Sequence, residues 1–168
     1  MTSFSVCPAC GADTLKADST KSVVCMTCGF VYFFNPAAAV AAIIVNAKNE
    51  LLVAVRANDP GKGLWDLPGG FVDPGESAEQ ALRREVKEEL NLEIDSITYF
   101  CSMPNEYVYK QFTYTTVDLA FICQVDNFSG LRAMDDIENA MFISKNEVDT
   151  KKFAFDSIRT IVSRYLHR

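Results

Sequence analysis

Three glutamates within five residues are the part of the sequence best suited to chemistry. Glu85, Glu88 and Glu89 stand at helical spacings i, i+3 and i+4, which would crowd their carboxylates onto one arc of about 100°. Like charges at these spacings repel, and partial burial costs more still. Divalent cations such as Mg²⁺, which prefers carboxylate oxygens and keeps waters, would offset that cost. The alternative is a solvated acidic face with Arg84 and Lys87 as ordinary salt-bridge partners.

Four cysteines form a second set of potential metal ligands. Cys7 and Cys10 make one C-x2-C pair, Cys25 and Cys28 make another, and a glycine follows each pair. Four thiolates at this spacing can enclose one Zn²⁺ tetrahedrally and leave no open position for water, so this zinc would be structural. Two chance C-x2-C pairs or two redox-active sites are the competing interpretations. A redox pair usually opens a helix in a thioredoxin-like unit, which neither pair does here.

The glutamates need a helix to hold them, and the flanking residues predict one over 77–90. Ser77 and Gln80 form a capping box that satisfies the first free backbone N–H groups. Asn91 tolerates the left-handed conformation that often ends a helix. Apolar side chains fall on one broad face at helical spacing: Ala78, Ala81, Leu82, Val86 and Leu90.

Strand-like segments lie on both sides of this helix. A second amphipathic helix is expected at the end of the chain, over 156–166. This order of elements predicts an α+β fold with a mixed sheet sandwiched between helices. The 168 residues accommodate a small cysteine module over 1–35 followed by a domain over 36–168. The expected strands cover 37–45, 50–56, 94–101, 112–125 and 140–143.

The charge and hydropathy of the chain limit its partners. A net charge of −6 argues against nucleic acid as a partner, although acidic sites bind phosphate substrates through cations. No apolar run reaches the ~18 residues that span a bilayer, and no signal-peptide pattern opens the sequence. A cytoplasmic protein without a membrane partner is expected, and a homodimer is compatible with the sequence.

The segment from Gly70 to Leu92 resembles the Nudix box, G-x5-E-x7-R-E-U-x-E-E-x-G-U, where U is aliphatic. One residue departs from it: Asn91 replaces a glycine, a mild change if the position needs a positive φ. The resemblance implies a Nudix α/β/α sandwich, preceded here by a zinc ribbon. The matching residues are Gly70, Glu76, Arg84, Glu85, Val86, Glu88, Glu89 and Leu92.

The resemblance also implies a metal site. Glu85 and Glu89 would be the main ligands of Mg²⁺ or Mn²⁺, and the Gly70 carbonyl would complete the coordination. Glu88 would be a further ligand or the base that activates water. Water would then attack a phosphorus of a diphosphate while the metals neutralise the developing charge.

Other residues would support this chemistry by the same resemblance. Arg84 and Glu76 would orient the glutamates through salt bridges. Family members place a further carboxylate in the loop before the last strand, and that spacing lands on Asp135, with Asp136 and Glu138 beside it. Asp135 or Glu138 would act as a metal ligand or base. Solvated loop acids are the alternative interpretation.

A zinc ribbon directly before a Nudix domain resembles the NADH pyrophosphatase branch of the family. That branch carries an S-Q-P-W-P-F-P motif eleven residues after the box glycine. At this position Ser102 and Pro104 match and Tyr107 keeps an aromatic ring, whereas three residues depart from the motif, Met103, Asn105 and Glu106. The resemblance therefore supports the architecture and leaves NADH specificity open.

Aromatic residues follow this motif at short intervals. Tyr107, Tyr109 and Phe112 could stack on an adenine or nicotinamide ring, with Ser102 as a further substrate contact. The alternative is that these rings belong to the core of a strand.

Taken together, the residues and the resemblance predict a Nudix pyrophosphohydrolase with catalytic Mg²⁺ or Mn²⁺ and structural Zn²⁺. Its substrate would be a nucleoside diphosphate linked to another group, such as NADH, ADP-ribose or a similar dinucleotide. A pyrophosphatase that sanitises (d)NTPs is the alternative. A non-catalytic Nudix ligand sensor is disfavoured, because degenerate sensors lose box glutamates and this chain keeps all three.

Overall fold

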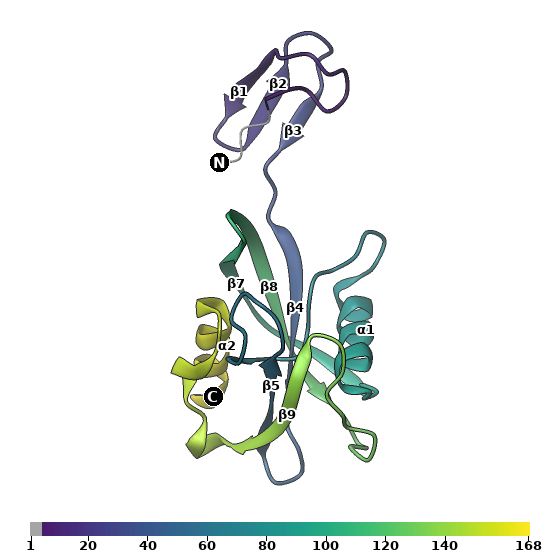
Figure 1. Ribbon diagram of the computed structural model, residues 1–168. Coiled ribbons are helices and arrows are strands. Elements are labelled where there is room, and N and C mark those ends of the chain that lie inside the picture. Colours follow the sequence, from purple (N-terminus) through teal and green to yellow (C-terminus); the bar gives the residue numbers. More distant parts are fainter. Residues whose placement is uncertain (1–4) are drawn as a thin grey trace. The chain divides into compact units, whose positions relative to one another are not determined.

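A computed structural model describes residues 5–168, and in it the chain divides after Pro36 (Figure 1). The first unit, Met1–Pro36, contains a three-stranded antiparallel sheet of order β1-β2-β3. Cys7 and Cys10 precede β1, Cys25 ends β2, and Cys28 lies in the turn that follows it. The strands are β1 (Leu15–Ser19), β2 (Ser22–Cys25) and β3 (Val31–Phe33).

The second unit, Ala37–Arg168, contains two three-stranded sheets. The first has the order β4-β8-β7, in which β4 runs parallel to β8 and β7 runs antiparallel to it. Its strands are β4 (Ala37–Ile44), β7 (Ser96–Tyr109) and β8 (Phe112–Gln124). The second sheet is antiparallel, with the order β6-β5-β9. Its strands are β5 (Glu50–Arg56), β6 (Trp65–Asp66) and β9 (Ile137–Ser144).

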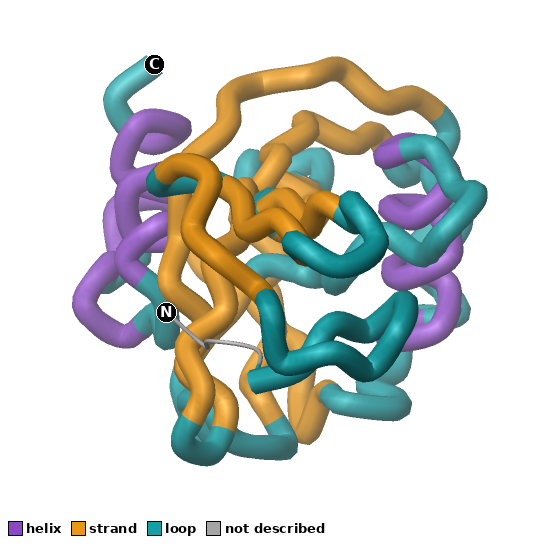
Figure 2. The backbone as a smooth tube through the Cα atoms, turned by 90° about the horizontal axis from the view of Figure 1, so that it is seen from above, coloured by secondary structure: helices purple, strands orange, loops and turns teal. Residues whose placement is uncertain are grey.

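Two helices cover opposite sides of these strands (Figure 2). Helix α1 (Ala78–Leu90) packs on β4 and β9, and α2 (Asp156–Leu166) packs on β7 and β8. Along β4, Val40 and Ala42 join the hydrophobic cluster on the α1 side, while Ala41 and Ile43 join the cluster on the α2 side. Burial on both faces explains why this strand is an unbroken apolar run. The predicted mixed-sheet sandwich is confirmed.

Helix α1 begins and ends as the sequence predicts. The Ser77 hydroxyl accepts a hydrogen bond from the Gln80 backbone N–H at 3.2 Å, and the Gln80 side chain accepts one from Ser77 N–H at 2.8 Å. Asn91 ends the helix with a left-handed φ of 54°. One buried member of the inner face is charged: Glu89 lies beside Val86 and Leu90.

The β7–β8 hairpin is longer than the sequence predicts. Strand β7 continues past residue 101 to Tyr109, so the segment 102–107 is part of a strand. Pro104 argues against a central strand, but β7 lies at the edge of its sheet, where proline is tolerated. Short 3-10 turns, η1 (Lys145–Glu147) and η2 (Thr150–Lys152), lead into α2.

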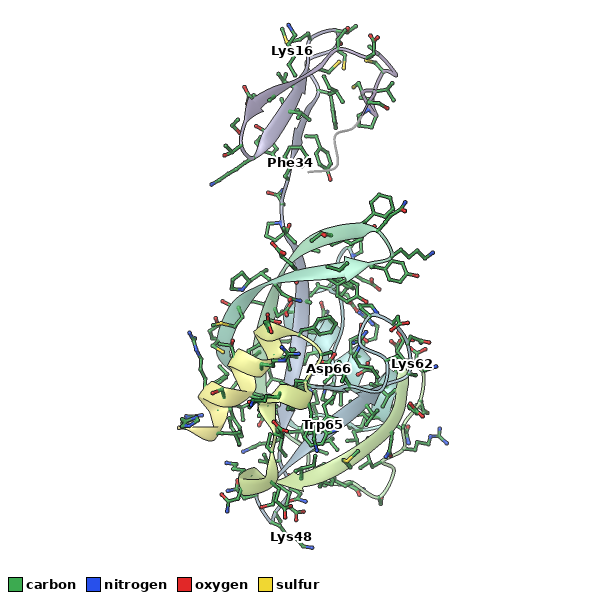
Figure 3. All side chains as sticks on the ribbon, turned by 60° about the vertical axis from the view of Figure 1, so that its left-hand side comes forward. Lys16, Phe34, Lys48, Lys62, Trp65 and Asp66 are labelled. Carbon is green, nitrogen blue, oxygen red and sulfur yellow. The ribbon has the colours of Figure 1, made fainter. Side chains whose placement is uncertain are left out.

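Polar side chains separate into surface and interior positions within the second unit (Figure 3). Lys48 lies exposed in the turn after β4, and Lys62 lies in an exposed loop. Asp66 on β6 is instead only 8% exposed. Among residues 5–168, no helix has the length and apolar character needed to cross a membrane.

Candidate active site and cysteine cluster

Arg84 on α1 connects the acidic side chains of the predicted site. Its Nε and Nη2 donate to the two carboxylate oxygens of Glu76, at 2.8 and 2.9 Å. Its Nη1 donates to Glu85 at 2.8 Å and to Glu88 at 3.2 Å, and Nη2 also reaches the Phe71 carbonyl at 3.1 Å. The hydrogen bonds from Arg84 lower the pKa of the Glu76 carboxyl. The guanidinium thus holds three carboxylates in fixed positions.

The three helix glutamates lie in different environments. Glu89 is 6% exposed, and its carboxylate accepts a hydrogen bond from the Gly69 N–H at 2.9 Å. Burial raises the pKa of Glu89 to about 8, and burial also raises the pKa of Glu85. The side chain of Glu88 is 50% exposed. Burial thus disfavours the charged forms of Glu85 and Glu89. A cation bound beside them would favour the charged forms again.

Two glycines let the backbone approach this helix closely. A Cβ at Gly70 would lie 2.5 Å from a carboxylate oxygen of Glu85. Gly69 has φ +144°, and a Cβ there would lie 2.0 Å from the Val40 carbonyl oxygen. The Gly70 carbonyl accepts a hydrogen bond from Val40 N–H at 2.8 Å, which leaves its second lone pair for another partner.

A cleft brings a loop acid to the helix glutamates. It is lined by Glu85 and Glu89, by the backbone of Gly69 and Gly70, and by Asp135. Asp136 also lines the cleft, whereas Glu138 is exposed on β9 outside it. Asp135 has a left-handed φ of 52°. Of the two predicted loop acids, the structure therefore places Asp135 next to the helix, together with the adjacent Asp136.

Backbone hydrogen bonds fix the loop before β9 against the end of α1. The Met134 N–H donates to the Glu89 carbonyl at 2.8 Å, and the Arg132 N–H donates to the Leu90 carbonyl at 3.2 Å. These carbonyls are among the last four of the helix, which have no partner within the helix itself. The loop that satisfies them is the one that carries Asp135.

The donor set of the cleft fits a hydrated divalent cation. All the candidate ligands offer oxygen, as Mg²⁺ and Mn²⁺ prefer. Within residues 5–168, only the four cysteines form a group of three or more ligands whose donor atoms all lie within 4.8 Å of one another. The carboxylates are thus spaced more widely than in a closed cage. Mg²⁺ uses one or two carboxylates and keeps several waters, so this spacing suits it.

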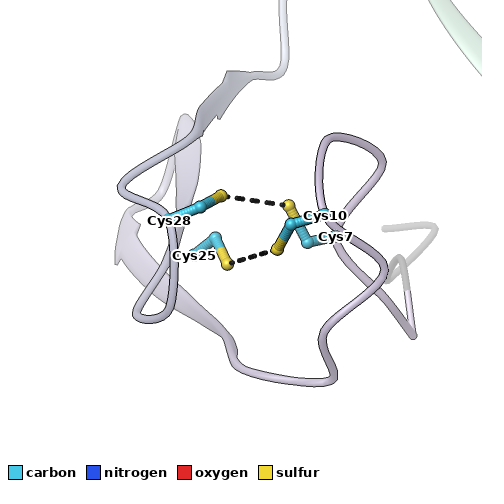
Figure 4. A group of neighbouring side chains, drawn as sticks. All are labelled: Cys7, Cys10, Cys25 and Cys28. Carbon is cyan, nitrogen blue, oxygen red and sulfur yellow. Dashed lines mark hydrogen bonds between the residues drawn. The ribbon is translucent and has the colours of Figure 1, made fainter.

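The four cysteines of the first unit converge on one point (Figure 4). The sulfurs of Cys7 and Cys28 lie 3.8 Å apart, and those of Cys10 and Cys25 lie 3.7 Å apart. A tetrahedral zinc with Zn–S bonds of about 2.3 Å would place its sulfurs about 3.8 Å from one another. The cluster therefore has the size that Zn²⁺ requires.

Equivalent turns present the two cysteine pairs. The Gly11 N–H donates to the Cys7 carbonyl at 2.8 Å, and the Gly29 N–H donates to the Cys25 carbonyl at 2.9 Å. Both glycines have a left-handed φ, +74° and +75°. Nothing lies within 4 Å of a Cβ built at either glycine, so the backbone conformation, and not crowding, favours glycine here.

Comparison with known proteins identifies the second unit. A NUDIX domain model matches residues 35–164. The chain belongs to the Nudix family. Its sequence is 36% identical over 131 residues to an ADP-ribose pyrophosphatase of Methanocaldococcus jannaschii, covering 77% of this chain and 73% of that protein.

Two further relatives extend the Nudix similarity. The human mitochondrial NAD(P)H pyrophosphatase NUDT13 is 29% identical over 148 residues, which cover 86% of this chain but 40% of the human protein. This chain thus matches less than half of that relative's length. A NUDIX hydrolase from Nitrosomonas europaea has the same fold, with a TM-score of 0.74 and 22% identity over 98% of this chain and 91% of that one.

A buried ion pair in the Nudix cleft is absent from the sequence prediction. Asp66 forms a 2.7 Å ion pair with Arg56, and both line the cleft. Burial raises the pKa of the Asp66 carboxyl to about 6, although Arg56 opposes the shift. The sequence held one indication of this pair: Asp66 lies between the apolar residues Trp65 and Leu67. A buried carboxylate is costly unless it is paired, so a partner such as Arg56 could have been expected.

Aromatic side chains form one wall of the Nudix cleft. Tyr107 lines the cleft and lies 5.5 Å from Phe71 in an edge-to-face contact. A shallow apolar surface next to it is made by Phe71, Tyr107, Tyr109 and Tyr114. Two predicted substrate residues lie elsewhere. Ser102 is half-buried opposite Leu119, and Phe112 is exposed opposite Tyr109 at the hairpin end.

Proposed function

We propose that this Nudix chain is a pyrophosphohydrolase that cleaves the diphosphate of a nucleoside diphosphate linked to a second group. NADH, ADP-ribose or a similar dinucleotide is the proposed substrate. The observation that carries the proposal is the convergence of Glu85 and Glu89 from one helix with Asp135 from a distant loop. The names of two relatives, an ADP-ribose pyrophosphatase and an NAD(P)H pyrophosphatase, support the substrate class.

The proposed metal ligands are Glu85, Glu89 and the Gly70 carbonyl. Mg²⁺ or Mn²⁺, when bound, would neutralise charge on the diphosphate and lower the pKa of a bound water. Glu89 contributes a carboxylate that is buried and oriented by the Gly69 N–H. Glu85 contributes one that is fixed by Arg84.

The remaining side chains position these groups and accept a proton. Glu76 accepts two hydrogen bonds from Arg84 and so fixes its guanidinium. Arg84 can then hold Glu85 and Glu88 in place. The attacking water loses a proton, and Glu88 or Asp135 accepts it. Glu88 is half-exposed beside the site, and Asp135 lines the cleft itself. Glu138 lies outside the cleft and is the weaker candidate among the loop acids.

The aromatic wall is proposed to bind a ring of the substrate. Tyr107, Tyr109 and Phe71 offer apolar faces beside the carboxylates. Stacking of a base on such rings contributes about 1–3 kcal/mol. Phe71 adds to the residues that the sequence nominates, while Ser102 and Phe112 receive less support from their positions.

The first unit is proposed to hold one structural Zn²⁺ through Cys7, Cys10, Cys25 and Cys28. The sulfur separations of 3.7 and 3.8 Å support this. Thiolate ligands persist in a reducing compartment, which agrees with the proposed cytoplasmic location. A small-molecule nucleotide is the proposed partner, and a homodimer is a further proposal to be tested by solution mass.

A substrate screen with Mg²⁺ and Mn²⁺ tests the proposal. It should cover NADH, NAD⁺, ADP-ribose, FAD, diadenosine polyphosphates and (d)NTPs. Release of two phosphate monoesters from a dinucleotide is the expected result. Release of pyrophosphate from (d)NTPs alone would favour the sanitising activity, and ligand binding without turnover would favour the sensor.

A further inference from the structure

Small side chains on β4 leave a cavity beside the carboxylate cleft. Ala39 lies opposite Asp118 in the parallel β4–β8 register, and Ala41 lies opposite Ala120. Ala39, Ala41 and Asp118 all line this cavity, which larger residues on β4 would fill. Gly69 and Gly70 line both the cavity and the cleft. A group bound in the cavity would therefore lie next to the reacting diphosphate.

One wall of the cavity carries a buried carboxylate. Asp118 is 6% exposed and accepts hydrogen bonds from the Thr116 hydroxyl at 2.8 Å and the Ser157 hydroxyl at 2.5 Å. Each carboxylate oxygen can accept more than one hydrogen bond, so the group retains capacity for a donor from a ligand. The two hydroxyls fix the orientation of the carboxylate from β8 and from α2.

A second polar group in the cavity lacks a partner. The side chain of Asn105 lines the cavity and makes no hydrogen bond to any residue within 5–168. Asn105 lies directly opposite Thr116 in the β7–β8 register, and Met103 lies opposite Asp118. Asn105 and Asp118 therefore lie on neighbouring strands and share one face of the hairpin. The amide offers two donors and an acceptor that nothing in the described chain uses.

Beside the Arg56–Asp66 ion pair, which also lines the cavity, three aromatic side chains provide walls that suit a planar ring. Phe71, Tyr107 and Phe155 line the cavity, and the Tyr107 ring lies 5.5 Å from each of the other two rings. Aromatic walls with a free amide and a carboxylate match a ring that has an exocyclic amine beside a ring nitrogen. Adenine has this edge, and asparagine pairs with it through two hydrogen bonds.

We propose that this cavity binds the adenine of the substrate and that Asn105 is its specificity-determining residue. The Asn105 amide contacts the exocyclic amine and the adjacent ring nitrogen, and Asp118 accepts a further hydrogen bond from the amine. This inference rests on the proposed function, because it assigns one half of the dinucleotide to a place beside the cleft. It also gives a role to the residue that replaces the tryptophan of the NADH pyrophosphatase motif.

The test compares ADP-ribose and NADH with their hypoxanthine counterparts, in which a carbonyl replaces the exocyclic amine. With Mg²⁺, wild-type kcat/KM should be roughly ten- to hundredfold higher for the adenine substrates. Asn105→Leu keeps the branched shape and the number of non-hydrogen atoms without the amide, and it should lower this ratio several-fold, while the contact with Asp118 keeps the ratio above one. Equal cleavage of each pair by the wild type would overturn the adenine pocket and leave the hydrolase standing. Cleavage of none of the four would overturn both.

A second variant tests the cavity without altering any hydrogen bond. Ala39→Val adds two methyl groups inside the cavity and should raise KM for ADP-ribose about tenfold or more, with a smaller change in kcat. Ala38→Val, on the opposite face of the same strand, is the matched control and should keep the wild-type KM. Wild-type KM in a folded Ala39→Val protein would overturn the assignment of the cavity.

Discussion

The side chain of Asn91 donates a hydrogen bond to the Gly130 carbonyl at 3.1 Å. Asn91 occupies the position where the Nudix box has glycine, and it keeps the left-handed backbone with a φ of 54°. It therefore ends α1 and also ties the helix to the loop that leads to Asp135. A glycine at position 91 could perform only the first of these tasks.

Asn91→Gly should separate the two roles of this residue. It preserves the left-handed backbone but removes the hydrogen bond to Gly130, so the free energy of unfolding should fall by about 1 kcal/mol. If the loop positions Asp135, kcat should fall several-fold as well. Asn91→Ala is the control, since it also strains the backbone and should destabilise more. Wild-type stability and kcat in Asn91→Gly would show that the contact is incidental.

Purified protein should contain about one zinc per chain. The four cysteine sulfurs already have the spacing of a tetrahedral site, and metal binding contributes directly to the stability of so small a unit. Cys25→Ser should abolish stoichiometric zinc and destabilise residues 5–36, while kcat changes by only a few-fold. Elemental analysis of fresh, reduced protein is the measurement. Zinc well below one equivalent would contradict the assignment.

The buried Asp66 should make stability depend on pH. Its pKa is about 6 in the folded chain, whereas an unfolded aspartate titrates near 4. Between about pH 4 and pH 6 the unfolded state loses its proton first, so the stability of the wild type falls by up to about 3 kcal/mol as pH rises. Asp66→Asn should lack this component, and exposed Asp126→Asn controls for the change in charge. Parallel pH profiles of unfolding for wild type and Asp66→Asn would refute this account.

The two predicted loop acids should differ in their effect on catalysis. Asp135 lines the cleft with Glu85 and Glu89, and Glu138 does not. Asp135→Ala should lower kcat at least tenfold, a loss typical of a proton acceptor or of a group that supports a metal. Glu138→Ala serves as its control and should stay within a few-fold of wild type. The assignment fails if the two variants lose activity equally.

Local features of the fold were predictable because neighbouring residues determine them. Ser77, Gln80 and Asn91 define the ends of α1 through short-range hydrogen bonds, and helical spacing alone brings Glu85 and Glu89 together. Contacts between residues far apart in the sequence could not be predicted in this way. The pairing of Asp66 with Arg56 depends on the β5–β6 register, and the juxtaposition of Asp135 with Glu89 depends on how a loop docks on α1.

The extent of β7 was missed for a related reason. Pro104 and Glu106 both disfavour a strand when judged by residue type. Pairing with β8 through Thr115 and Val117 overrides that preference at the sheet edge. The same pairing places Asn105 in the cavity beside Asp118, so the candidate specificity residue became visible only in the structure.

The proposed activity depends on a catalytic cation held by Glu85 and Glu89. Glu85→Gln and Glu89→Gln keep the size of each side chain but remove the charge. Losing one ligand should lower kcat/KM with Mg²⁺ by roughly 10²–10⁴-fold. The metal-free variants should be as stable as wild type or more so. A neutral amide avoids the cost of a half-buried charge at position 85, and Glu89, with a pKa of about 8, is largely uncharged near pH 7 without metal.

The decisive experiment measures kcat/KM with Mg²⁺ and thermal unfolding without metal. Both are measured on the same preparations of wild type, Glu85→Gln and Glu89→Gln. If both glutamates hold the cation, kcat/KM falls by at least a hundredfold in each variant while the melting temperature stays level or rises. Near-wild-type activity of both variants on every substrate that the wild type hydrolyses would contradict it, and the acidic helix would then be only a charged face of the fold.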